Sequence, residues 1–226
     1  MDIFKRHEIF EIETLKRLKA HHLLEPLAFG GGTMLRLCHE LSRYSADLDF
    51  WFVKERDYEK YFDKMAKALG KDCEITDSQI KFHTLLFEIR SPGYPRRLKI
   101  EIRKQSGEFD FQDQIAFSRH SVIQVIVRAF TLEQMMKNKT AALADRGEIR
   151  DGFDIEFLLR KGVALPDMDD SRVSRIERAV KGFKPSDFKV KLGSILESDM
   201  RKYHVENGFG LLEQKIRSLQ GRRSAV

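Results

Sequence analysis

Strand and helix patterns alternate through the first 130 residues of the chain and then give way to helical patterns alone. Short apolar runs such as Leu27–Phe29 and Leu48–Val53 are typical of strands, whereas almost no convincing strand follows Phe130. The change predicts an α+β protein with two parts. Residues 1–130 should form a mixed sheet with flanking helices, and residues 131–226 a helical lobe.

Apolar spacing and turn residues give approximate positions for the elements. Besides a first helix between Ile3 and Leu18, we expect strands at Leu27–Phe29, Leu48–Val53, Ile80–Arg90, Leu98–Arg103 and Val122–Val127, and helices at Met34–Leu41, Tyr58–Leu69, Leu132–Leu143, Ile155–Arg160, Val173–Val180, Phe188–Met200 and Leu211–Leu219. The segment Ser91-Pro-Gly-Tyr-Pro95 should join two of the strands as a hairpin, because its two prolines and a glycine favour a turn.

Three glycines and a threonine, Gly30-Gly31-Gly32-Thr33, join an expected strand to an expected helix. Without Cβ atoms, the backbone N–H groups of such a turn can approach a triphosphate closely, and Thr33 offers a hydroxyl. The sequence matches neither a P-loop nor a dinucleotide-binding motif. Taken alone, the glycines are better explained as a tight turn.

Two aspartates flank a leucine in Asp47-Leu48-Asp49. Residues two apart on a strand share a face, so the two carboxylates should lie side by side. An exposed edge strand with two solvated acids is the plainer explanation. The aromatic run Phe50-Trp51-Phe52 indicates a buried strand instead, and buried acids need partners such as Mg²⁺ bridging them to substrate phosphates.

Glu101 is the candidate for a third carboxylate, which a two-metal phosphoryl transfer requires. It lies in a predicted strand where Ile100 and Ile102 should face the core and Lys99, Glu101 and Arg103 the other side. A solvated charged face explains the same pattern equally well. The case for Glu101 therefore depends on Asp47 and Asp49.

Lys139 and Arg146 are seven residues apart, so they lie nearly on one face of a helix. The acidic segment Arg150-Asp151-Gly152-Phe153-Asp154 follows at once. A lysine facing the sheet would neutralise triphosphate charge, although most helical lysines are solvated. Lys137 points elsewhere. For a triphosphate ligand, Lys139→Ala should lower activity and leave stability almost unchanged.

These residues resemble the signature of the AbiEii-type nucleotidyltransferase toxins, members of the polymerase-beta-like superfamily. The resemblance covers roughly residues 20–160. It includes the glycine turn, Leu35 and Arg36, Arg43 and Ser45, the strand Asp47–Phe50, and the two segments Lys139–Arg146 and Arg150–Asp154. Family members commonly have aspartate where this chain has Glu101.

The resemblance implies a Mg²⁺-dependent enzyme that moves a nucleoside monophosphate from an NTP to an acceptor hydroxyl, with the tRNA 3′ end as one candidate acceptor. It implies metal and catalytic roles for Asp47, Asp49 and Glu101, and nucleotide-binding roles for Gly31, Gly32, Thr33, Ser45, Lys139, Arg146 and Asp151. It also implies a toxin of a toxin–antitoxin or phage-defence pair, with a cognate antitoxin protein as partner.

Charge and composition are compatible with this function without specifying it. The excess of 41 basic over 35 acidic residues gives +6, which favours a polyanionic partner, but no dense basic arm is present. No apolar run reaches the roughly 18 residues of a membrane span, and the first twenty residues carry charges throughout, so we expect a cytoplasmic protein. Cys38 and Cys73 should be reduced thiols.

Two other functions fit the same sequence. One is a nucleotide- or RNA-binding module that keeps the fold but has weak or no activity, which the substitution at Glu101 leaves open. The other keeps the enzyme but directs it to a small molecule or a protein hydroxyl. Fold alone does not choose between acceptors.

Overall fold

The computed structural model describes residues 3–105 and 107–223. The chain divides into two compact units. Unit 1 comprises Met1–Glu40 and Tyr44–Thr131, and unit 2 comprises Leu41–Arg43 and Leu132–Val226. The short segment Leu41–Arg43 therefore belongs with the later helices, although it lies between two elements of unit 1.

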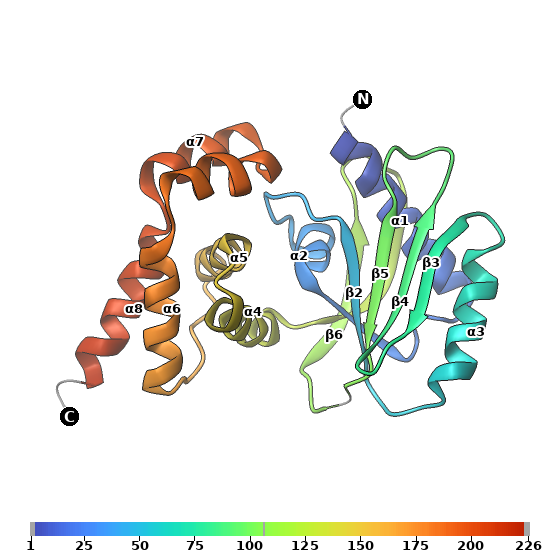
Figure 1. Cartoon of the computed structure of the whole chain (residues 1–226), viewed down its shortest axis with the longest axis horizontal. Coiled ribbons are helices and arrows are strands. Elements are labelled where there is room, and N and C mark those ends of the chain that lie inside the picture. The colour runs from blue at the N-terminus through green and yellow to red at the C-terminus, as the bar shows by residue number, and fades with distance from the viewer. Residues whose placement is uncertain (1–2, 106, 224–226) are drawn as a thin grey trace. The chain divides into compact units, whose positions relative to one another are not determined.

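A seven-stranded mixed sheet forms the centre of unit 1, in the order β3-β4-β5-β2-β1-β7-β6 (Figure 1). Strand β2 pairs antiparallel with β1 and parallel with β5, and β1 pairs parallel with β7. The strands are β1 Leu27–Gly30, β2 Asp47–Phe52, β3 Glu74–Ile80, β4 Thr84–Arg90, β5 Leu98–Arg103, β6 Phe111–Phe117 and β7 Gln124–Phe130. The predicted mixed sheet with flanking helices is confirmed.

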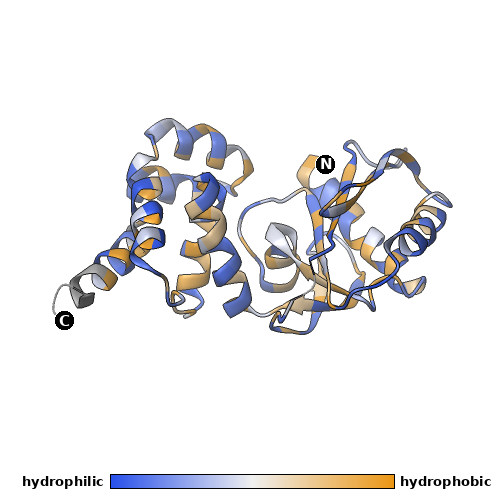
Figure 2. Cartoon of the chain, turned by 60° about the horizontal axis from the view of Figure 1, so that its bottom comes forward, coloured by the Kyte–Doolittle hydropathy of each residue, from blue (hydrophilic) through white to orange (hydrophobic). Residues whose placement is uncertain are grey.

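Helices α1 (Ile3–Ala20), α2 (Gly31–His39) and α3 (Tyr58–Leu69) flank this sheet. Helices α1 and α3 contact each other and the strands β3, β4, β5 and β7, while α2 contacts β1, β2 and β6. Burial alternates along β2 and β5, where Leu48, Phe50 and Phe52 enter the core. Figure 2 shows hydrophobic and hydrophilic segments interspersed along the helices and strands.

Unit 2 is helical and has α5 at its centre. Its helices are α4 Leu132–Arg146, α5 Ile149–Arg160, α6 Asp170–Gly182, a π-helical segment Asp187–Leu192, a 3₁₀ turn Gly193–Ile195, α7 Ser198–Asn207 and α8 Gly210–Arg223. Nine of the twelve residues of α5 are buried, and α5 contacts α4, α8 and the π-helical segment. At Gly152 a Cβ would lie 2.8 Å from the Phe209 ring, so the glycine permits close packing.

Several elements differ from the sequence prediction. Strands β3 and β6 were not predicted, β7 starts at Gln124 instead of Val122, and α2 begins at Gly31 instead of Met34. The single helix expected over Phe188–Met200 is wrong. It is broken near Gly193, where the extended Leu196 pairs with Arg43 in a β-bridge. Within the described residues, no helix is long and apolar enough to span a membrane.

Candidate functional site

The acidic face of unit 1 is set by strand register. Asp47 and Asp49 lie on the half-buried face of β2, and Leu48 between them is buried. Because β2 pairs in parallel with β5, Asp49 lies directly opposite Glu101, and Asp47 lies opposite Lys99. On the other side of β2, Asp49 pairs with Gly30, the last residue of β1. The structure thus brings Asp47, Asp49 and Glu101 together on two adjacent strands, with Gly30 of β1 beside them.

Gly31 begins α2 directly beside Asp49. Its φ of +75° is in the left-handed region, and a Cβ at this position would lie 2.3 Å from Oδ2 of Asp49. Both facts require glycine here. Glycine at position 31 therefore lets the amino terminus of α2 lie closer to β2 than a residue with a Cβ atom would. Helix amino termini also favour nearby anions.

Thr33 and Ser45 have different surroundings. The Thr33 hydroxyl is buried and donates to the backbone carbonyl of Asp47 at 2.6 Å. This bond ties the first turn of α2 to the start of β2. Ser45 lies two residues before β2 in an irregular segment and is half-buried. The Thr33 hydroxyl thus has an internal acceptor, so any contact of Thr33 with phosphate would use its backbone.

Lys99 supplies a cation to the acidic face. Its Nζ lies 2.9 Å from Oε2 of Glu101, and both side chains are partly exposed. Burial acts to lower the pKa of Lys99, but the hydrogen bond to Glu101 and the charges of Glu101, Asp47 and Asp49 outweigh it and raise the pKa. The ammonium therefore senses all three carboxylates.

The acidic face offers the oxygen ligands that Mg²⁺ prefers. Across residues 3–105 and 107–223, no three His, Cys, Asp or Glu side chains are grouped closely enough to form a complete metal site. Magnesium seldom uses such a cage, because it binds through one or two carboxylates together with substrate phosphates and water. Asp47 and Asp49 on one strand, with Glu101 opposite Asp49, fit that pattern.

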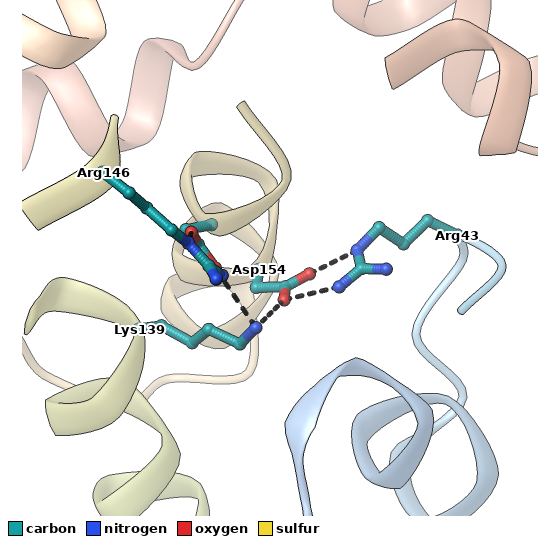
Figure 3. A network of polar contacts seen from close by, with 5 residues as sticks. Arg43, Lys139, Arg146 and Asp154 are labelled. Atoms are coloured by element: carbon teal, nitrogen blue, oxygen red, sulfur yellow. Dashed lines mark hydrogen bonds and ion pairs between the residues drawn. The ribbon is translucent and has the colours of Figure 1, made fainter. Parts of the chain in front are cut away.

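In unit 2 the predicted residues Lys139, Arg146 and Asp151 form one ion-pair network with two others, Arg43 and Asp154. The Arg43 guanidinium donates to both carboxylate oxygens of Asp154, at 2.6 and 2.7 Å. The Lys139 ammonium lies 2.7 Å from Asp154 and 3.3 Å from Asp151. Arg146 makes two bonds to Asp151, at 2.7 and 2.8 Å. Figure 3 shows the Asp154 carboxylate between Arg43 and Lys139.

Burial distinguishes the members of this network. The side chains of Asp151 and Asp154 are 0% exposed, that of Lys139 is 10% exposed, and that of Arg146 is 51% exposed. Burial acts to raise the pKa of Asp154, but the charges of Arg43 and Lys139 outweigh it and lower the pKa. Three cations against two carboxylates leave a formal charge of +1, and Arg146 carries it closest to solvent.

Sequence reasoning assigned no role to Lys99, Arg43 or Asp154. Asp154 follows Asp151 by three residues on one helix and lies in the same Arg150–Asp154 segment of the family resemblance, from which only Asp151 was given a role. Lys99 is two residues from Glu101 on the same strand face. Arg43 has no comparable local signal, because its partner Asp154 is 111 residues away.

Comparison with known proteins gives one family. The family model for the nucleotidyl transferase AbiEii toxin of Type IV toxin–antitoxin systems matches residues 13–212. No curated protein sequence matches the chain.

Solved structures share the fold. The Helicobacter pylori protein JHP933 is 20% identical, with a TM-score of 0.55 and 96% of each chain covered. A second H. pylori protein, provisionally assigned as a nucleotidyltransferase, is 21% identical, with a TM-score of 0.58, and the match covers 93% of this chain and 96% of that one.

Proposed function

The chain belongs to the family of AbiEii nucleotidyl transferase toxins, and from this premise we propose that it transfers a nucleoside monophosphate from an NTP to an acceptor hydroxyl with Mg²⁺ as cofactor. The observation that carries the proposal is the register that aligns Gly30, Asp49 and Glu101 across three strands. It sets the amino terminus of α2 beside Asp49 of β2, and the neighbouring strand β5 carries Glu101. A phosphate-binding helix end and a metal-binding face thus meet at one point.

The first turn of α2 holds the triphosphate in this proposal. Backbone N–H groups at a helix amino terminus lack partners within the helix and point toward an approaching anion. Gly31 and Gly32 present these groups without Cβ atoms, and Thr33 contributes its backbone N–H. Ser45 adds a hydroxyl from the segment before β2. The bond from Thr33 to the Asp47 carbonyl keeps the helix end aligned with the carboxylates.

Asp47, Asp49 and Glu101 are the residues that would hold Mg²⁺, which supplies charge neutralisation of the phosphates when it is bound. The acceptor oxygen attacks the α-phosphorus, a new P–O bond forms, and the bond to the leaving pyrophosphate breaks. The proton of the acceptor hydroxyl passes to the Glu101 carboxylate. Lys99 donates to that carboxylate and so holds it in place beside the reacting groups.

Lys139, Arg146 and Asp151 are the nucleotide-binding residues that we propose for unit 2. Their network carries a formal charge of +1, and the half-exposed Arg146 is the member best placed to receive a phosphate from solvent. Asp151 holds Arg146 through two bonds and so fixes the direction of its guanidinium. Lys139 helps to neutralise Asp151 and Asp154 inside the unit.

For the acceptor we propose RNA, with the tRNA 3′ end as the first candidate. The net charge of +6 supports a polyanionic partner. The family is that of a toxin in a Type IV toxin–antitoxin system, so a cognate antitoxin is the expected protein partner. A role in phage defence is part of the same proposal.

A labelling experiment tests this function. The protein is incubated with each labelled NTP and Mg²⁺, together with total tRNA, with a cell protein extract, or without acceptor. We expect one NTP to label tRNA and Asp49→Asn to lower the rate at least 100-fold, while Asp63→Asn on the exposed face of α3 retains it. Equal labelling by wild type and Asp49→Asn would refute the site, and labelling of protein alone would refute the RNA acceptor.

A further inference from the structure

A concave region of unit 1 lies at the opposite end of the β1–β2 pair from the carboxylates. Strand β2 begins at the acidic face with Asp47 and ends at Phe52, after which the chain leads into α3 (Figure 1). A pocket of about 570 Å³ opens at that end. We call it the basic pocket. It is lined by His21, His22, Leu23, Glu25, Pro26, Val53, Lys54, Arg56, Asp57, Lys60, Tyr61, Lys64 and Arg128.

Five lysines and arginines line the basic pocket against two acids, which gives a formal charge of 5 − 2 = +3 with the histidines neutral. Both acids are engaged by other groups. The Glu25 carboxylate lies 2.6 Å from Nδ1 of His22, and the Asp57 carboxylate caps α3 by accepting from the backbone N–H of Lys60. Each of the two negative charges thus already has a hydrogen-bond partner.

The charges on α3 are sorted by face. Lys60 and Lys64 are one turn apart and line the pocket, whereas Glu59 and Asp63, also one turn apart, do not. Like charges four residues apart destabilise a helix by roughly 0.2–0.5 kcal/mol, and opposite charges at that spacing would avoid this cost. The paired lysines thus concentrate positive charge on the pocket side of the helix.

Two further cations are held in place by neighbours. Arg128 on β7 donates from Nη1 to the Glu25 carbonyl at 3.0 Å. The Arg56 guanidinium lies 5.7 Å from the ring centroids of Phe52 and Tyr61. Neither contact neutralises the guanidinium charge. Together with Lys60 and Lys64, they surround the pocket with cations from three separate elements.

We propose that the basic pocket binds phosphate groups of an RNA strand. The lining favours RNA over an acidic protein. Its residues Leu23, Pro26 and Tyr61 are buried and Val53 is half-buried, so no large exposed apolar side chain is available to anchor a protein interface. The pocket volume is in the range of nucleotide-sized ligand sites. Five residue steps along β2, at about 3.3 Å each, separate Asp47 from Phe52 by roughly 17 Å. A strand of a few nucleotides spans that length.

This inference deepens the proposed function by giving the acceptor RNA a docking site away from the chemistry, and it rests on that function only for the identity of the acceptor. The pocket is testable without catalysis. Binding of a labelled 12-nucleotide single-stranded RNA is followed by fluorescence anisotropy, without NTP or Mg²⁺, over a series of salt concentrations. The proteins are wild type, Lys60→Gln/Lys64→Gln and Lys67→Gln, with thermal unfolding as a check on folding.

We expect the double variant to bind RNA on the order of ten-fold more weakly. The slope of the logarithm of the binding constant against the logarithm of the salt concentration should also be shallower by about 1 to 1.5, because each phosphate contact contributes about 0.7 to this slope on single strands. Lys67, which is exposed on the same helix but outside the pocket lining, controls for the loss of one positive charge from α3, and Lys67→Gln should stay within about two-fold of wild type.

Two results would overturn the inference: equal RNA affinity for the double variant and Lys67→Gln, or no RNA binding by the wild-type protein at low salt. Asp49→Asn, which removes only a carboxylate of the acidic face, should keep RNA affinity. Failure of the transfer reaction and failure of the docking site therefore give different results.

Discussion

The candidate-site acids of the two units have opposite surroundings. In unit 1, Asp47, Asp49 and Glu101 are half-buried and lie near the Lys99 ammonium, and these four side chains have a formal charge of −2. In unit 2, Asp151 and Asp154 are fully buried and share three cations. The side chains of the first group have a net negative charge, and those of the second group have a net positive charge.

This difference separates two uses of carboxylates. Acids that remain partly solvated and under-neutralised are suited to receive a metal ion, and their removal should affect activity more than folding. Acids that are buried in bidentate pairs hold cations in fixed positions, and their removal leaves buried charges without partners. The comparison therefore predicts that mutations in the two units divide between activity and stability.

The largest effect is expected for Asp154→Asn. The variant leaves buried Arg43 and nearly buried Lys139 without their shared carboxylate, and breaking a buried pair costs about 3 to 5 kcal/mol. Urea unfolding measures the loss. The control is Asp145→Asn on α4, whose exposed pair with Arg175 should contribute at most about 1 kcal/mol. Equal stabilities for the two variants would remove the contrast between the units.

The effect of Asp154 should also depend on pH. Its pKa is lowered in the folded protein, so its stabilisation is present above the unfolded pKa of about 3.9 and is lost as pH falls through the folded pKa. The stability difference between wild type and Asp154→Asn should therefore narrow in acid. Unfolding measured at pH 7 and below pH 4 tests the sign.

Lys139→Ala is expected to have the next largest effect. From sequence, this change should lower activity without altering stability. The burial of Lys139 between two aspartates changes the expectation, because hydrogen bonds to charged groups are worth about 1.5 to 3 kcal/mol. Thermal unfolding should detect the loss, while Lys137→Ala, two residues away and exposed, should unfold like wild type. An unchanged unfolding temperature for Lys139→Ala would contradict the network.

Sequence predicted the centre of the sheet better than its edges. Strands β2 and β5 carry buried residues at alternate positions, which gives a period-two pattern on their own. The two strands that were not predicted, β3 and β6, are the edges of the sheet. Most of their residues are exposed, so Glu-Ile-Thr-Asp-Ser-Gln-Ile and Phe-Gln-Asp-Gln-Ile-Ala-Phe lack a clear apolar face.

The candidate site was predictable where its members are close in sequence. Asp47 and Asp49 are two apart, and Lys139, Arg146 and Asp151 lie within thirteen residues. Arg43 was not predictable, because its role depends on the Leu41–Arg43 segment belonging to unit 2. Glu101 was proposed from sequence as the third carboxylate, but its position opposite Asp49 was not predicted, since strand order is set by long-range packing that no local pattern records.

Gly31→Ala should have an intermediate effect on stability. An alanine at φ of +75° costs about 1 to 2 kcal/mol, and its Cβ would push Asp49 from its position. Gly182→Ala at the end of α6 is the matched control, since nothing lies within 4 Å of its added Cβ. Unfolding and transfer rates are measured for both. We expect Gly31→Ala to lose activity as well as stability, and a fully active variant would show that Asp49 has room to move.

The smallest effect is expected for Lys99→Gln. The Lys99–Glu101 pair is partly exposed, so its contribution to stability is discounted to less than about 1 kcal/mol. The pKa of Lys99 is raised in the folded protein, which means that its contribution is complete below the unfolded pKa of about 10.4 and is lost as pH rises through the folded pKa. The stability difference from wild type should thus be present at pH 8 and disappear in strong alkali. Lys67→Gln, which removes an exposed lysine of α3, should show no such change.

Because Lys99→Gln leaves three carboxylates without the nearby ammonium, the variant should also bind Mg²⁺ more tightly than wild type in calorimetry. Weaker binding would mean that Lys99 orients the carboxylates for the metal, and the under-neutralised acids of unit 1 would then depend on a fixed cation as those of unit 2 do.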